Sequence, residues 1–257
     1  GEATVEPSET FTKTLDPPSR DLVRRYLEHV GGDPDRDVET VPPHLFSQWT
    51  FDLLAKTLGH LTFPLHEMVN GGCRLEVDGE LPLGRRLRAT ATLVEVDQSP
   101  SRLRFHHVIE TGPLRKPDAV VAHMYNVLVR PTSSRGAESS KTDGGRKRDE
   151  PIVSATADEI ERWELAEDAG LDFAKLTGDF NPIHWLRPAA KAAGFENTIL
   201  HGFATMARAF EDIEQGCLAA GERIETLDVR FTNPLVLPAD VGLYVGPGEE
   251  EDECPVY

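Results

Sequence analysis

The 257-residue sequence predicts an α+β protein in which each of two halves wraps a curved antiparallel sheet around one buried helix. In each half, a long apolar stretch precedes shorter segments that alternate polar and apolar residues or are rich in β-branched residues. Between the halves lies a polar segment that lacks large apolar residues and cannot bury enough surface to fold. We therefore divide the chain into residues 1–130, a flexible linker over residues 131–150, and residues 151–257.

The first half begins with a predicted amphipathic helix in SRDLVRRYLEHVGG. Ser19 or Asp21 can cap its start, and Gly31 can end it. A second apolar stretch, residues 45–59, is long enough to be a buried helix. The pattern then changes to that of four antiparallel strands, in GCRLEVDG, RRLRATATLVEV, SRLRFHHVIE and AVVAHMYNVLVR.

The second half repeats this order with low residue identity, which indicates an internal duplication. We expect a strand in PIVSAT, a helix in DEIERWELAEDAG, and a long apolar helix in ILHGFATMARAFEDIEQGCLAAG. Strands should follow in ETLDVRFTNPLVL and ADVGLYV. After Val245 the sequence leaves room for one short strand, so we expect about thirty residues of sheet to be absent and the second half to be C-terminally incomplete.

Charge and cysteine content narrow the function classes. A formal charge of -17 argues against non-specific nucleic-acid binding, although a local cationic rim could still bind an anionic carrier. The three cysteines are far apart and form no CxxC pair, which favours a cytoplasmic protein without structural zinc. No stretch is long and apolar enough to predict a membrane-spanning helix.

The segment LTGDFNPIHW, residues 176–185, combines turn residues with two groups that can exchange protons. Gly178, Asn181 and Pro182 are explained by a turn alone. Because Pro182 disfavours a continuous helix, Asp179 and His184 must be brought together by a loop that turns back. A carboxylate and an imidazole aimed at one water molecule form an acid/base pair.

The dipeptide His201-Gly202 opens the long apolar helix of the second half. Free N–H groups in the first helical turn carry partial positive charge, and glycine lets a substrate oxygen approach them. Gly202 could therefore form an oxyanion hole. Alternatively, Gly202 only permits close packing and His201 only caps the helix.

Together, FAKLTGDFNPIHWLRPAA and ILHGFATMAR resemble the signature of the MaoC-like, R-specific enoyl-CoA hydratases, also called hydratase 2. The resemblance is close over residues 173–208. It implies a double hot-dog fold and reversible addition of water to trans-2-enoyl thioesters. It also implies that Asp179 holds the water and acts as base, that His184 transfers the partner proton, and that the Gly202 N–H meets the enolate oxygen. Asn181 would support the loop.

The first half resembles the non-catalytic hot dog of two-hot-dog members in PPHLFSQWTF and FPLHEMVNGG, where the repeat has lost the acid/base loop. We therefore expect His66 to be structural. One departure concerns Phe210, which stands where some bacterial single-domain members have a serine near the catalytic aspartate.

Two other functions remain open: a hot-dog thioesterase, and a non-enzymatic acyl-thioester-binding protein. Arg187, Lys191 and Arg208 are candidate contacts for a coenzyme A or acyl-carrier-protein thioester. We expect no other cofactor and no metal. The duplicated halves predict a pseudo-dimer within one chain, and two chains could pair further.

Overall fold

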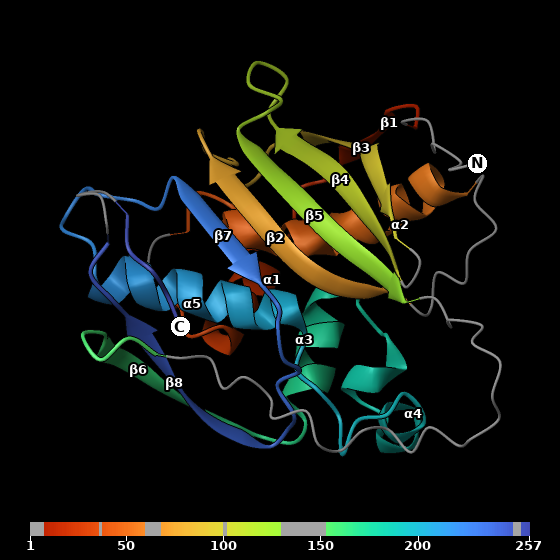
Figure 1. Ribbon diagram of the computed structural model, residues 1–257. Coiled ribbons are helices and arrows are strands. Elements are labelled where there is room, and N and C mark those ends of the chain that lie inside the picture. Colours follow the sequence, from red (N-terminus) through yellow and green to blue (C-terminus); the bar gives the residue numbers. More distant parts are fainter. Residues whose placement is uncertain (1–7, 36–37, 60–67, 100–101, 130–152, 249–252) are drawn as a thin grey trace, which may run out of the picture.

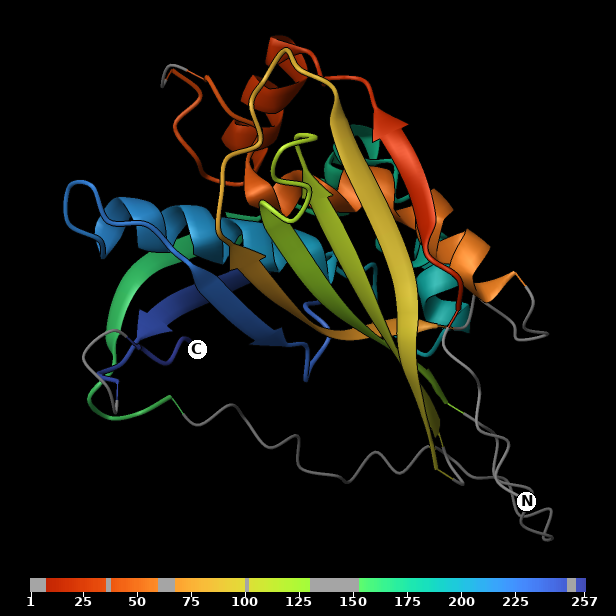
Figure 2. The same ribbon diagram turned by 90° about the horizontal axis from the view of Figure 1, so that it is seen from above.

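The computed structural model describes residues 8–35, 38–59, 68–99, 102–129, 153–248 and 253–257. Within these residues, a curved antiparallel sheet covers two long helices, one from each half (Figures 1 and 2). The predicted linker over residues 131–150 and the predicted structural role of His66 lie outside the described residues. The boundaries of the halves stay a prediction, although β5 ends at Val129 and β6 begins at Asp158.

The first half supplies the larger part of the sheet. Its two helices and four later strands follow the predicted order, whereas the first strand, β1, was not predicted. Its strands are arranged β1-β3-β4-β5-β2. The elements are β1 (Phe11–Leu15), α1 (Arg20–His29), η1 (Pro43–Phe46), α2 (Ser47–Leu58), β2 (Val69–Val77), β3 (Leu87–Gln98), β4 (Arg102–Gly112) and β5 (Val120–Val129). Ser19 caps α1 by accepting a hydrogen bond from the Leu22 N–H, and Gly31 follows with φ 84°.

The second half contributes the remaining described elements. These are β6 (Asp158–Leu165), α3 (Ala169–Thr177), η3 (Pro182–His184), α4 (Arg187–Ala192), α5 (Gly202–Gly216), β7 (Thr226–Arg230) and β8 (Ala239–Val245). Strand β7 pairs antiparallel with β2, so one six-stranded sheet crosses the boundary between the halves. Strands β6 and β8 form a separate pair. The predicted internal pseudo-dimer agrees with this arrangement, whereas the predicted incompleteness of the second half stays a prediction.

Two predictions for the start of the second half were wrong. DEIERWELAEDAG does not open a helix, because its first eight residues form β6. The bulge in β6 between Glu159 and Glu161 explains the error, since it spaces the inward-facing Ile160 and Trp163 three residues apart, as in a helix. The helix of this region, α3, begins only at Ala169, and the described part of PIVSAT, residues 153–156, contains no strand.

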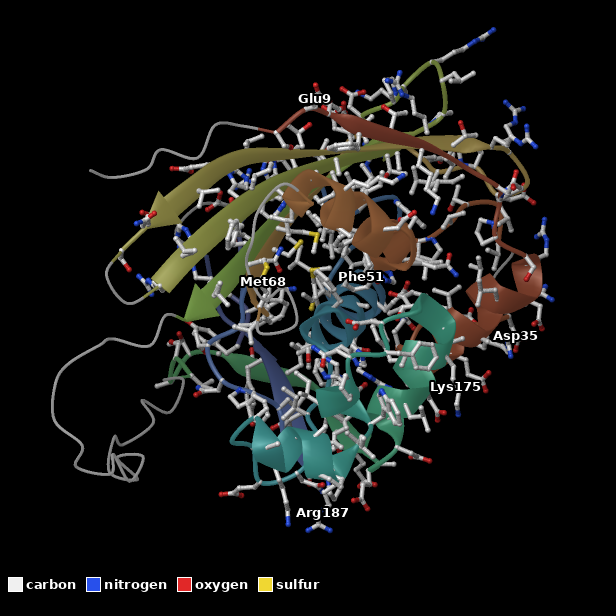
Figure 3. All side chains as sticks on the ribbon, turned by 90° about the vertical axis from the view of Figure 1, so that its right-hand side faces the viewer. Glu9, Asp35, Phe51, Met68, Lys175 and Arg187 are labelled. Atoms are coloured by element: carbon white, nitrogen blue, oxygen red, sulfur yellow. The ribbon has the colours of Figure 1, made fainter. Side chains whose placement is uncertain are left out.

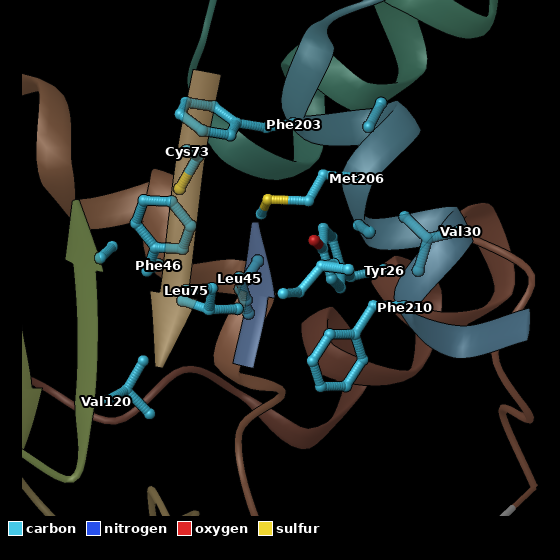
Figure 4. Packing of buried hydrophobic residues seen from close by; sticks show 14 of the residues in the cluster. Tyr26, Val30, Leu45, Phe46, Cys73, Leu75, Val120, Phe203, Met206 and Phe210 are labelled. Atoms are coloured by element: carbon cyan, nitrogen blue, oxygen red, sulfur yellow. The ribbon is translucent and has the colours of Figure 1, made fainter. Parts of the chain in front are cut away.

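The main hydrophobic core lies between the sheet and both long helices. It joins residues from the two halves, and Figure 4 shows Phe46 and Leu75 of the first half in the same cluster as Phe203 and Met206 of the second. A smaller cluster lies under the first-half sheet and contains Leu58, Leu93, Leu103, Phe105 and Leu128. Because the main core is shared, the halves bury their apolar faces against each other.

Among the residues described, no helix has the length and apolarity needed to cross a lipid bilayer. The cytoplasmic location stays a prediction.

Candidate active site

The loop that follows α3 has the turn geometry expected from its residues. Gly178 ends α3 in the left-handed region, with φ 83°, which favours glycine. The Asn181 side chain accepts a hydrogen bond from the Ile183 N–H at 3.4 Å, and Pro182 begins η3. The chain therefore reverses over a few residues and places Asp179 and His184 on the same side of the loop.

A second glycine, Gly170 in α3, lets this loop lie against the helix. A Cβ at position 170 would lie 2.2 Å from the carbonyl oxygen of His184, which a larger residue could not allow. We did not single out Gly170 from the sequence, because a glycine inside a helix has many explanations. Its role is to permit the close approach that fixes the backbone of His184.

The imidazole of His184 is held in one tautomer by the backbone. Its Nδ1 lies 2.8 Å from the carbonyl oxygen of Ile199, so Nδ1 must carry a hydrogen and donate it. Burial lowers the pKa of His184 below its usual value of 6.5, although the Ile199 carbonyl and Asp179 act in the opposite direction. The neutral ring therefore presents the lone pair of Nε2 as an acceptor.

Asp179 faces the same space and keeps 19% of its side chain exposed. Its Oδ1 accepts a hydrogen bond from the Asn181 N–H at 3.3 Å. Burial raises the pKa of Asp179 above its usual value of 3.8, and the nearby His184 and the Asn181 N–H partly offset this. The carboxylate is a stronger base than one in water.

His201 completes the cluster from the opposite side. Its Nε2 donates to the backbone carbonyl of Asp179 at 3.0 Å, and its ring stacks on His184 with centroids 3.6 Å apart. Burial, and then the neighbouring His184, lower the pKa of His201 to about 3. His201 thus stays neutral and acts as a fixed hydrogen-bond donor to the loop. His201 is the N-cap residue of α5, as one of the two interpretations expected, but its side chain makes no capping hydrogen bond.

Gly202 is the first residue of α5, so its N–H is one of the donors that lack a partner within the helix. The structure also gives Gly202 a packing role, because an added Cβ would lie 2.9 Å from the ring of Phe231. The surroundings of Gly202 therefore agree with both interpretations of this glycine.

The three predicted cationic contacts have different surroundings. Arg187 and Lys191 lie on α4 and are exposed, and Figure 3 shows Arg187 pointing away from the body of the protein. Arg208 instead donates a hydrogen bond to the carbonyl oxygen of His29 at the end of α1. Its guanidinium thereby joins α5 to the first half, and its role in binding a carrier stays a prediction.

Phe210, which stands where some members have a serine, packs its ring against His44 with centroids 5.0 Å apart. It is not among the described contacts of Asp179. The described contacts of Asp179 come from Asn181, His201 and the hydroxyl of Thr177, which accepts from the Asp179 N–H at 3.4 Å. The loop is thus supported by its own residues and by the start of α5.

Asp179, His184 and His201 each offer a side-chain atom within 4.8 Å of the others, which is also compatible with a bound cation. However, the observed hydrogen bonds occupy Nδ1 of His184 and Nε2 of His201. The expectation that no metal is needed stays a prediction.

Comparisons with known proteins agree with the motif. Residues 144–252 match the model of the MaoC like domain. A segment of 77 residues is 42% identical to 3-hydroxyacyl-thioester dehydratase X of Mycobacterium tuberculosis, and it covers 30% of this chain but only 26% of that protein. A longer match of 216 residues, 21% identical, relates 81% of this chain to 71% of the probable enoyl-CoA hydratase 2 of Dictyostelium discoideum.

The fold is shared with solved structures. The crystal structure of HtdX of Mycobacterium tuberculosis matches with a TM-score of 0.70 and 19% identity, over 96% of this chain and 92% of that chain. At this identity the likeness establishes the fold and not the reaction. Residues 144–252 therefore belong to the MaoC-like domain family, and the chain has the double hot-dog fold of the MaoC-like dehydratases.

Proposed function

We propose that the protein is an (R)-specific enoyl-thioester hydratase, which also catalyses the reverse dehydration of 3-hydroxyacyl thioesters. The observation that carries this proposal is the pairing of Asp179 with a His184 whose tautomer is set by the Ile199 carbonyl. Two proton acceptors on one short loop suit a reaction in which a single water is added across a double bond. The names of two relatives, a 3-hydroxyacyl-thioester dehydratase and a probable enoyl-CoA hydratase, support the same reaction.

In the proposed hydration, a water molecule donates hydrogen bonds to the Asp179 carboxylate and to the Nε2 lone pair of His184. As the water oxygen bonds to C3, its proton passes to this pair, and the electrons of the C2=C3 bond move toward the thioester oxygen. The N–H of Gly202 stabilises that oxygen as it gains charge. The pair then returns the proton to C2, so one water is consumed and both residues regain their starting state.

The substrate is an acyl thioester carried by coenzyme A or by acyl carrier protein, and the proposed reaction uses no further cofactor. Arg187 and Lys191 would contact the anionic carrier because both are exposed on α4, directly after the loop that carries His184. The first half would contribute to the acyl-binding space, and pairing of two chains remains compatible with the proposal.

The decisive experiment mixes the purified protein with a short trans-2-enoyl-CoA and follows the enoyl absorbance and free thiol together. We expect the absorbance to fall without thiol release, and to fall at least about 100-fold more slowly with Asp179→Asn. Thiol release with the enoyl group intact would instead identify a thioesterase. No change in either signal over several chain lengths and both carriers would favour an acyl-binding protein.

A further inference from the structure

The halves are related by an approximate two-fold axis that can be located from individual residues. Gly31 and Gly178 follow α1 and α3 with φ angles of 84° and 83°. Five residues before each glycine stands an aromatic residue, Tyr26 in α1 and Phe173 in α3. These two rings contact each other with centroids 6.2 Å apart. Equivalent residues that contact each other lie on a two-fold axis.

The entries to the two long helices give a second, independent pair. His44-Leu45-Phe46 precedes α2, and His201-Gly202-Phe203 spans the start of α5. The rings of Phe46 and Phe203 meet edge to face with centroids 5.1 Å apart. The same axis therefore relates His44 to His201.

This correspondence identifies the first-half counterpart of the catalytic arrangement. His44 packs on Tyr26 with ring centroids 5.5 Å apart, as His201 packs on Phe173 at 4.8 Å. Gly32, which follows Gly31, corresponds to Asp179, which follows Gly178. The first half thus keeps the histidine and has glycine in the position of the carboxylate.

A carboxylate is nevertheless present beside His44, and it comes from the other half. Oε1 of Glu211 on α5 lies 3.0 Å from Nε2 of His44, and the side chains are 1% and 0% exposed. A Cβ added to Gly32 would lie 2.7 Å from Oε2 of Glu211. The Glu211 carboxylate therefore fills the space that a side chain at position 32 would need.

We propose that Tyr26, His44 and Glu211 form a closed counterpart of the catalytic site, in which a carboxylate from the second half replaces the missing loop aspartate. The hydroxyl of Tyr26 donates to the carbonyl oxygen of His44 at 3.1 Å, and its oxygen lies 3.0 Å from Nδ1 of the same residue. Each polar atom of the His44 ring thus has a partner inside the protein. The site is sealed against substrate, and it fastens α5 to the first half.

Other hydrogen bonds also join α5 to its surroundings, and two of them come from side chains close to Glu211 in the sequence. Arg208 donates to the carbonyl of His29, and Asp212 accepts from Nε1 of Trp163 at 2.7 Å. Those contacts lie on either side of Glu211 in the sequence and do not reach His44 in the described structure. Removing Glu211 alone should therefore leave the His44 ring without its buried carboxylate.

The test moves the carboxylate from position 211 to position 32. Glu211→Ala and Gly32→Asp are made singly and together, and the equilibrium constants for unfolding are measured with denaturant. Gly32 has no positive φ, and after the Glu211 carboxylate the nearest neighbour of an added Cβ is Cδ2 of the flexible Leu27 side chain, at 3.0 Å. Position 32 can therefore accept an aspartate once Glu211 is shortened. We expect Gly32→Asp to destabilise the wild type, because it meets Glu211, and to stabilise the Glu211→Ala protein by at least tenfold in that constant.

A matched control repeats the transfer without the histidine. In a His44→Leu, Glu211→Ala background, Gly32→Asp should no longer stabilise, since the carboxylate would be buried without a partner. If the aspartate variants do not fold, Gly32→Ala is used in the same cycle. It should lower the folding equilibrium constant of the wild type at least tenfold more than that of the Glu211→Ala protein. Equal effects of both Gly32 changes in both backgrounds would overturn the proposal, whatever reaction the enzyme catalyses.

Discussion

Nε2 of His201 lies 3.0 Å from the backbone oxygen of Asp179 and 3.8 Å from its carboxylate. The start of α5 therefore holds the catalytic loop through one neutral imidazole. Replacing His201 by leucine should lower kcat by roughly 100-fold, because a small displacement of the reacting groups is costly. Glutamine can place an amide N–H near the former Nε2 and should recover most of this loss. Steady-state kinetics would show it, and equal kcat values for the leucine and glutamine variants would argue against a hydrogen-bonding role.

Asp179 should contribute to catalysis but lower the stability of the folded protein. Because burial raises its pKa, the folded protein favours the protonated form, so ionised Asp179 costs stability above the unfolded pKa of 3.8. We expect Asp179→Asn to lower kcat by about 10²- to 10⁴-fold and to raise the free energy of unfolding at pH 7. The stability gain should vanish at pH 3, where both forms are neutral. A less stable Asn variant at pH 7 would contradict this assignment.

Acid should inactivate the enzyme through the same pair. Asp179 must be ionised and His184 neutral, and the pKa of the first is raised from 3.8 while that of the second is lowered from 6.5. The value of kcat/KM should therefore fall as pH decreases through the interval between these two values, with apparent pKa values that belong to the pair. Initial rates at constant ionic strength would measure it. A rate that increases from pH 7 to pH 5 would mean that His184 acts in its protonated form.

The two interpretations of Gly202 can be separated by relieving its packing against Phe231. Gly202→Ala keeps the backbone N–H but would place Cβ 2.9 Å from that ring. If packing is the whole reason for the glycine, adding Phe231→Leu should restore both stability and kcat. We expect stability to return while kcat stays at least about tenfold low, because the methyl group also obstructs the oxygen that the N–H must meet. Thermal unfolding and kinetics on the same four proteins would decide between the interpretations.

His107 is a buried histidine outside the catalytic loop, and neither of its ring nitrogens has a hydrogen-bond partner among the described residues. Burial lowers its pKa from 6.5 to about 4. Between these pH values the unfolded chain binds a proton at His107 that the folded protein does not bind. His107→Leu should raise the free energy of unfolding at pH 7 by about 1–3 kcal/mol. It should also reduce the loss of stability between pH 6.5 and pH 4 by about 1.4 kcal/mol per pH unit. An unchanged acid slope would show that another group takes up the proton.

Most elements of the fold could be predicted, because the spacing of apolar residues along the sequence differs between helices and strands. The buried helix of each half and the later strands of both halves were found where their patterns placed them. The error at β6 arose from one bulged residue, Ile160, which gave a strand the apolar spacing of a helix. Such a shift depends on pairing with β8, some eighty residues away, and has no local signal.

The catalytic loop was predictable for a different reason: its residues are close in sequence and belong to a specific motif. The groups that orient it were not, since the carbonyl oxygens of Ile199 and Asp179 are backbone atoms that every residue type offers. Glu211 was also missed. It stands in the acidic stretch Glu211-Asp212-Ile213-Glu214 of α5 as one charged residue among several, and its partner His44 lies 167 positions earlier.

The pairing of β2 with β7 joins two copies of one motif within a single polypeptide. If the two halves were identical subunits, the equivalent positions 32 and 179 would hold the same residue. A glycine in one subunit would then replace the aspartate in the other. Covalent linkage breaks this symmetry and makes the association independent of protein concentration. The first half can therefore have glycine at position 32 while the second half keeps Asp179 and His184.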